Sequence, residues 1–257
     1  MMNTLHAELN RLYLCGAPGG TDPDKEAPGL VAPDGRVRAL VLALARPADW
    51  NALSTVWQGV QTDLELPAPA IAVNGIDGYQ LWFSLGEPVP AAQAQAFLEA
   101  LRLRYLGRVA PQRVGTMPAV DVSAPGKIQH APLVPTLQQG TGRWSAFVAP
   151  DLAAIFSEEP WLDVRPSPEA QATVLSRLAC TQPAAFQAAM ASITEKNVGN
   201  PEHHAVAGPA PIGKSLDPKR FLLDVMGDPS IALHLRMEAA KALLPYCEGN
   251  LDGKSGS

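Results

Sequence analysis

The stretch Ile71–Leu85, IAVNGIDGYQLWFSL, constrains the fold of this chain more than any other. Two apolar runs flank a Gly-Ile-Asp-Gly turn at residues 75–78, and glycine reaches the positive φ angles that a tight turn needs. We therefore predict a β-hairpin. In its second arm, strand alternation puts Gln80 and Trp82 on one face and Tyr79 on the other. The face with Gln80 and Trp82 either meets a ligand or is covered by a loop.

The composition is that of a globular chain with a sizeable core. The 257 residues are 47% hydrophobic and 18% charged. No apolar run approaches the roughly 20 residues that span a bilayer, and polar residues interrupt the N-terminal apolar pattern. We therefore expect no membrane partner and a cytoplasmic protein. Cys15, Cys180 and Cys247 are far apart, which favours free thiols in a reducing compartment.

The charge distribution leaves two interpretations open. A net charge of −5 argues against strong non-specific binding of nucleic acid. From Glu99 to Ser145, however, there are six basic residues against two acidic ones. This stretch is either a surface that meets phosphates or a solvated helix face followed by a loop.

Apolar spacing predicts an α+β order. The expected elements are a central strand at Arg36–Ala45, a helix from Asp49 to about Leu64, the hairpin, an amphipathic helix at Pro90–Leu106, and a last strand at Met117–Val122 or Arg143–Ala149. This order is that of a ferredoxin-like or RRM-like βαββαβ core with two helices on one face. Both last strands together would add extra strands to the sheet.

Helix-start signals then predict a helical C-terminal region. Ser167-Pro168-Glu169 is typical of an N-cap followed by a first turn, and the expected helix runs to about Cys180. A further helix is expected from Pro183 to about Ile193. The predicted division is an N-terminal helix and loop at 1–35, an α+β domain at 36–166, a helical region at 167–250 and a disordered tail at 251–257.

Gly208–Ser215, GPAPIGKS, matches the phosphate-loop pattern G-x-x-x-x-G-K-[ST]. Its context argues against that function, because no buried strand precedes it and Pro209 and Pro211 remove two backbone N–H donors. We therefore expect no cofactor. The adjacent His203 and His204 would point apart, which favours a surface loop over a metal site.

Three stretches share features with one family: VLALARP at Val41–Pro47, NGIDGYQLWFSLGEPVP at Asn74–Pro90, and LVPTLQQGTGRWSAFVAPDLAAI at Leu133–Ile155. Together, Arg36–Pro166 resembles the archaeo-eukaryotic primase superfamily, the primase-polymerase type. The resemblance implies a scaffold whose acids bind divalent metal ions and whose hairpin histidine contacts nucleotide phosphates.

At the matching positions this chain departs from the family. Ala43 and Ala45 stand where the family has metal-binding acids, and Gln80 stands where it has histidine. An alanine methyl group cannot ligate magnesium, which demands oxygen. The resemblance therefore implies a primase fold that has lost its catalysis, without a bound metal. An active nucleotidyltransferase is the alternative, and it would need displaced acids, for which the candidates are Asp34, Asp77 and Asp121.

The first functional hypothesis is a catalytically inactive primase-like protein that binds single-stranded nucleic acid or a replication protein, with its oligomeric state left open. Trp82, if exposed, would offer a stacking surface. The expected binding residues are Gln80, Trp82, Arg102, Arg104, Arg108, Arg113 and Arg143. The second hypothesis is a helical interaction or packaging accessory protein with the sheet as scaffold. Asp217–Tyr246 resembles a helical segment of phage small terminase-like proteins, which implies an origin on a phage or mobile element.

Overall fold

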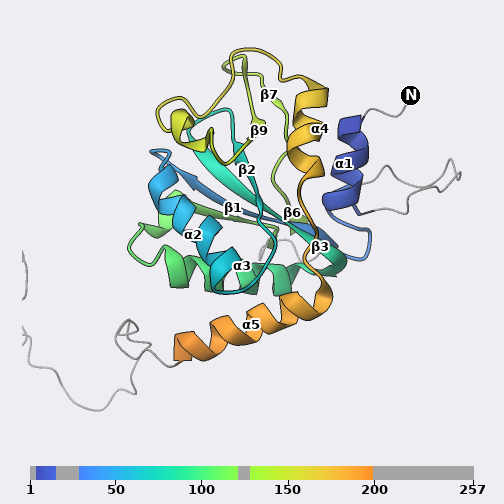
Figure 1. The fold of residues 1–257 in the computed structure, drawn as a ribbon, viewed down its shortest axis with the longest axis vertical. Helices are drawn as coiled ribbons and strands as arrows, with labels where there is room; N and C mark the ends of the chain where they lie inside the picture. The colour runs from blue at the N-terminus through green and yellow to red at the C-terminus, as the bar shows by residue number, and fades with distance from the viewer. Residues whose placement is uncertain (1–3, 16–28, 121–127, 199–257) are drawn as a thin grey trace, which may run out of the picture. The chain divides into compact units, whose positions relative to one another are not determined.

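The computed structural model describes residues 4–15, 29–120 and 128–198 (Figure 1). Its centre is a five-stranded sheet of order β4-β1-β3-β2-β9, in which each neighbouring pair is antiparallel. The strands are β1 (Arg36–Ala45), β2 (Ala70–Val73), β3 (Gly78–Pro90), β4 (Val114–Met117) and β9 (Ala146–Val148). Two small pairs lie outside this sheet: β5 (Ala119–Val120) with β6 (Ile128–Gln129), and β7 (Leu137–Gln138) with β8 (Arg143–Trp144).

The helices are α1 (Thr4–Leu12), α2 (Trp50–Thr62), α3 (Ala91–Tyr105), α4 (Pro168–Ser176) and α5 (Pro183–Val198), with 3-10 turns at Pro111–Arg113 and Ala153–Phe156. None of the helices in the described ranges is long and apolar enough to cross a membrane. The phosphate-loop pattern, the histidine pair, the terminase-like segment, the tail and Asp121 lie outside the described residues.

The predicted hairpin is confirmed, and one side chain organises its turn. The Asn74 Oδ1 accepts hydrogen bonds from the backbone N–H groups of Ile76, Asp77 and Gly78, at 2.8, 2.9 and 3.0 Å. Gly75 has a φ of +80°, a conformation that costs little only without a Cβ. The turn therefore sets the β2–β3 register, in which Ala72 lies opposite Gln80.

Strand β1 has the predicted bounds and lies between β4 and β3. Its leucines at 40, 42 and 44 pack into one core, and Ala39 and Val41 pack into a second core on the other face. Burial on both faces explains why the strand is an almost continuous apolar run.

Both predicted last strands contribute, with changed boundaries. The strand at the β1 edge is β4, Val114–Met117, which begins earlier than Met117–Val122 and pairs with Val41–Leu44. It ends there because Pro118 has no backbone N–H to continue the ladder. The stretch Arg143–Ala149 is divided: β8 pairs with β7, and only β9 joins the main sheet, beside β2.

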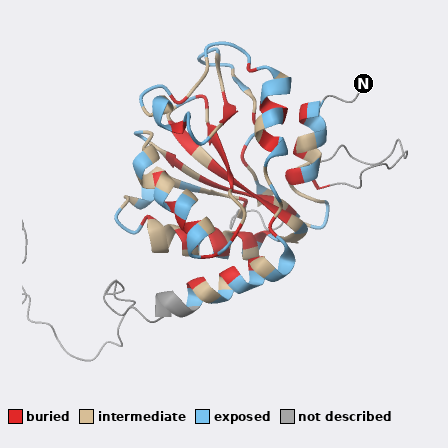
Figure 2. Cartoon of the chain, viewed as in Figure 1, coloured by how far each residue is buried: buried red, intermediate tan, exposed pale blue. Residues whose placement is uncertain are grey.

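Helices cover both faces of the sheet, not only one. Side chains of α2, α3 and α5 share the core that contains Tyr79 and Phe83. Helices α2 and α3 therefore lie on one face of the sheet, as predicted. On the opposite face, α1 and α4 lie side by side over Trp82 and Phe147. Figure 2 shows the strands buried between these layers.

Helices α2 and α4 begin directly after the predicted start residues Asp49 and Ser167, and the predicted N-cap role of Ser167 is confirmed. Asp49 caps α2 by accepting from the Ala52 N–H at 3.0 Å, and Ser167 caps α4 by accepting from the Ala170 N–H at 3.3 Å. Helix α4 ends at Ser176, earlier than the predicted Cys180. The chain then runs beside β3, where the Thr181 N–H donates to the Ser84 carbonyl at 2.8 Å. Helices α4 and α5 belong to the same compact unit as the sheet, Met1–Pro201.

Candidate functional site

The sheet face that the primase resemblance singles out is formed by β1 and β3. Ala43 lies opposite Gln80, and Ala45 lies opposite Gly78, so the compared positions are neighbours. All three side chains at 43, 45 and 80 are partly exposed. Asp77, at the end of this row, forms an ion pair with Arg46 at 3.0 Å.

The alternative acids are not assembled into a metal site within the described ranges. The exposed Asp34 accepts a hydrogen bond from the Arg36 backbone N–H at 3.1 Å. Asp77 also accepts from the Asn74 side chain. No group of three or more His, Cys, Asp or Glu residues in the part of the chain that is described could hold a metal ion.

Trp82 does not offer the stacking surface that depended on its exposure. Its side chain is fully buried, with its ring centre 5.3 Å from that of Tyr13 and 5.9 Å from that of Phe147. Its indole N–H donates to the Gln80 Oε1 at 3.0 Å. Of the two interpretations of this face, the structure supports the covered one, because α1 and α4 close over Trp82.

His130 completes the cover of this face. Its Nε2 lies 2.9 Å from the Ala39 carbonyl oxygen, which can only accept, so Nε2 carries the proton. Its ring centre is 6.2 Å from that of Trp82. Burial lowers the pKa of His130 below its ordinary value, because the charged imidazolium would lose its solvation.

Three of the predicted arginines have partners within the chain. Arg102 pairs with Glu99 at 2.5 Å, one turn away on α3. Arg104 pairs at 2.9 Å with Asp63, the C-cap residue of α2, and Arg113 donates to the carbonyl of Pro47 at the same distance. A phosphate would have to compete with these partners for the guanidinium groups.

The pKa of the Asp63 carboxyl group reflects its ion pair with Arg104 and two further hydrogen bonds. Burial raises its pKa, but hydrogen bonds from the hydroxyls of Thr62 and Tyr105 and from the Arg104 guanidinium outweigh burial. The net effect is a pKa below the ordinary value, so the group stays ionised at neutral pH. Asp63 therefore joins α2 to α3, and Arg104 has a structural partner.

Arg108 and Arg143 differ from the other three. Arg108 is exposed and has no hydrogen bond or ion pair to any described residue. The Arg143 guanidinium lies 3.5 Å from the centre of the Trp161 ring. A cation over an indole face is attracted by the ring's quadrupole.

Arg143 belongs to a set that we call the tryptophan–arginine cluster: Arg143, Trp144, Trp161 and Arg165. The contacts are crossed, because Arg165 lies 5.7 Å from the ring centre of Trp144, the residue next to Arg143. Two backbone hydrogen bonds between Trp144 and Leu162, of 2.8 and 3.0 Å, hold the two segments together. The cluster therefore combines two indoles and two guanidinium groups on two segments that are joined by backbone hydrogen bonds.

The cluster faces solvent and has no internal counter-ion. Arg165 is exposed and both tryptophans are partly exposed. Within the described ranges no carboxylate lies in ion-pair distance of either guanidinium. The sequence reasoning identified Arg143 alone. Tryptophans 144 and 161 in polar, proline-rich surroundings were an available signal for the rest.

No protein-family model matches this chain, and no curated protein matches it significantly.

Proposed function

We propose that this chain is a non-catalytic, cytoplasmic binding protein on a primase-like scaffold, and that it binds single-stranded nucleic acid through the tryptophan–arginine cluster. The scaffold part rests on element order. The order β1-α2-β2-β3-α3-β4, with α2 and α3 packed on one face, is that of a βαββαβ ferredoxin-like unit. The pairing of β1 with the glycine hairpin also supports it.

The absence of catalysis is proposed from the row that contains Ala43 and Gln80. A two-metal mechanism needs carboxylate oxygens at such a position to hold both ions. Here Ala43 offers only a methyl group, and the carboxamide oxygen of Gln80 already accepts a hydrogen bond from the Trp82 indole N–H. Asp77, the nearest acid along the hairpin, is paired with Arg46.

The tryptophan–arginine cluster is the observation that carries the binding function. Indole faces stack on any base, and each stacked base contributes about 1–3 kcal/mol. A guanidinium in contact with a ring keeps its outer N–H groups for a phosphate. Neither Arg143 nor Arg165 must break an ion pair within the described residues to bind one.

Fluorescence anisotropy with a labelled oligothymidylate tests this proposal. Trp161→Ala and Arg143→Gln should each weaken binding by roughly ten-fold, since each loses a stacking or phosphate contact. Arg102→Gln is the matched control, because Arg102 is held by Glu99, and its affinity should equal that of the wild type. With two phosphates contacted, log K should fall with log salt with a slope of about −1.4. Equal affinities of all variants, or no binding, would refute the proposal.

A protein-binding function is the second candidate, and the covered sheet favours it. With α1 and α4 on one face and α2, α3 and α5 on the other, the sheet acts as scaffold and the outer surfaces make contacts. Tryptophan and arginine are also the residues most enriched at energetic centres of protein interfaces. This candidate predicts no oligonucleotide binding near physiological salt, together with self-association or capture of a protein that Trp161→Ala abolishes.

A further inference from the structure

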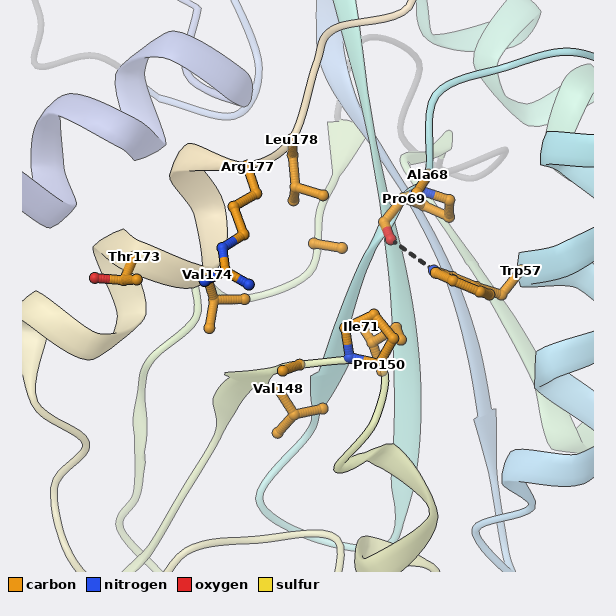
Figure 3. A pocket seen from close by; sticks show the side chains of 12 residues that line it. Trp57, Ala68, Pro69, Ile71, Val148, Pro150, Thr173, Val174, Arg177 and Leu178 are labelled. Atoms are coloured by element: carbon orange, nitrogen blue, oxygen red, sulfur yellow. Dashed lines mark hydrogen bonds between the residues drawn. The ribbon is translucent and has the colours of Figure 1, made fainter.

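A cavity of about 360 Å³ lies between α2 and α4, where β2 begins and β9 ends (Figure 3). Ten of its twelve lining residues are apolar, and only Thr173 and Arg177 are polar. Trp57 forms one wall and Val174 faces it from α4. A cavity of this size and lining is typical of a site for a small ligand with an apolar body.

The side-chain N–H and O–H groups that line the cavity already donate within the chain, with one exception. The Trp57 indole N–H donates to the Pro69 carbonyl at 3.1 Å, as the dashed line in Figure 3 shows. The Thr173 hydroxyl donates to the Glu169 carbonyl of its own helix at 2.9 Å. Pro69 and Pro150 have no N–H, so neither can donate to an added strand of a peptide. Among the side chains that line the cavity, Arg177 is therefore the one with unused donors for a ligand acceptor.

The Arg177 guanidinium has no hydrogen bond or ion pair to any described residue, whereas the Arg177 backbone N–H caps α4 by donating to the Leu175 carbonyl. No acidic residue lines the cavity. A cation at the end of a helix often binds the last carbonyl groups. Here Arg11 of α1 does so, with bonds of 2.9 Å to the carbonyls of Leu175 and Leu178. The Arg177 guanidinium is thus a positive charge beside an apolar cavity, and it does not bind the carbonyl groups at the end of α4.

We propose that this cavity binds an amphiphilic monocarboxylate, with its alkyl chain against Trp57, Ile71 and Val148 and its carboxylate on Arg177. The planar guanidinium fork matches a carboxylate in two parallel hydrogen bonds. Burial of the alkyl chain supplies most of the affinity, because it removes apolar surface from water. The site shares no residue with the tryptophan–arginine cluster, so it does not depend on the proposed function.

Isothermal titration calorimetry of the whole protein with decanoate and with decanol tests this site, below the concentration at which either aggregates. Both should bind the wild type. Arg177→Gln should weaken decanoate roughly five-fold, as expected for one partly solvated ion pair, and leave decanol unchanged. Arg108→Gln is the matched control, because it removes another exposed guanidinium without an ion pair to a described residue, and one that does not line the cavity. It should change neither affinity.

A second variant tests whether the alkyl chain of the ligand lies in the cavity. Val174→Trp should fill the cavity and abolish binding of both ligands, and circular dichroism would establish that it folds. Amide shifts of Ile71 and Val148 on adding decanoate provide a readout on the folded wild type that needs no variant. Absence of binding, an unchanged decanoate affinity in Arg177→Gln, or shifts confined to other residues would each overturn the proposal.

Discussion

Ala43 and Gln80 lie opposite each other in the antiparallel pair β1–β3, on the sheet face that also carries Trp82. The primase resemblance aligns these positions with a metal-binding acid and a phosphate-binding histidine. Their adjacency is what that resemblance requires of the two positions, but neither side chain carries a carboxylate. A methyl group opposite an amide cannot replace two carboxylates around a divalent ion.

The first prediction concerns nucleotidyl transfer. Purified protein should neither synthesise nor extend a primer on a single-stranded template with magnesium or manganese, because no carboxylate lies at position 43 or 45 to hold the ions. Gel analysis of labelled primers measures this. Template-dependent extension that disappears in Asp77→Asn would instead identify Asp77 as a displaced acid and would contradict the proposed absence of catalysis.

The second prediction compares two tryptophans. Trp82→Ala should lower the free energy of unfolding by about 3–5 kcal/mol, because it empties a fully buried site between Tyr13 and Phe147. Trp161→Ala should cost about 1 kcal/mol or less, since its ring is partly exposed. Urea denaturation followed by circular dichroism measures both. Similar losses for the two variants would argue against the burial of Trp82.

The third prediction concerns the hairpin turn. Gly75→Ala should destabilise by about 1–3 kcal/mol, because φ is +80° and the new Cβ would lie 2.8 Å from the Ser145 nitrogen. Asn74→Ala should lower the free energy of unfolding by about 1–2 kcal/mol, because the three backbone N–H groups that donate to the Asn74 Oδ1 would lose their acceptor. Gly140→Ala is the control: nothing lies within 4 Å of its Cβ, and the change should stay within about 0.5 kcal/mol. A Gly75→Ala protein as stable as this control would disprove the turn geometry.

The fourth prediction is a pH dependence from His130. The pKa of this imidazole is lowered in the folded protein, so the unfolded chain binds a proton first as the pH falls. Its contribution to stability should be complete above about pH 6.5, the ordinary histidine pKa, and should decrease below it. Unfolding free energies at several pH values measure this decrease. The wild type should lose more stability than His130→Gln between pH 7 and pH 5, and equal losses would be inconsistent with a buried neutral imidazole.

The hairpin, β1, α2 and α3 were predictable because their signals are local. The Asn74 turn, the Asp49 cap and the alternation of Tyr79 with Gln80 each involve residues within a few positions of one another. The strand at Met117–Val122 was misplaced because apolar residues continue past Pro118, while the ladder cannot.

The candidate site was less predictable than the fold. Gln80, Trp82 and the arginines were assigned from their residue types and from the resemblance, without knowledge of their partners. Glu99 and Asp63 already pair with Arg102 and Arg104, and α1 and α4 cover Trp82. The tryptophan–arginine cluster arises from two segments that only a backbone bridge between Trp144 and Leu162 brings together.

The amino-acid sequence alone specified the strands, the turn, the caps and the two faces of each strand. These features depend on backbone conformation over only a few residues. Whether the second face of the sheet would be open or covered depended on contacts between distant segments. Arg11 and Leu175, joined by a hydrogen bond of 2.9 Å, are 164 residues apart. Packing between such segments decided which tryptophans are core and which face solvent, because burial is a property of the assembled layers and alternation along one strand specifies only its sides.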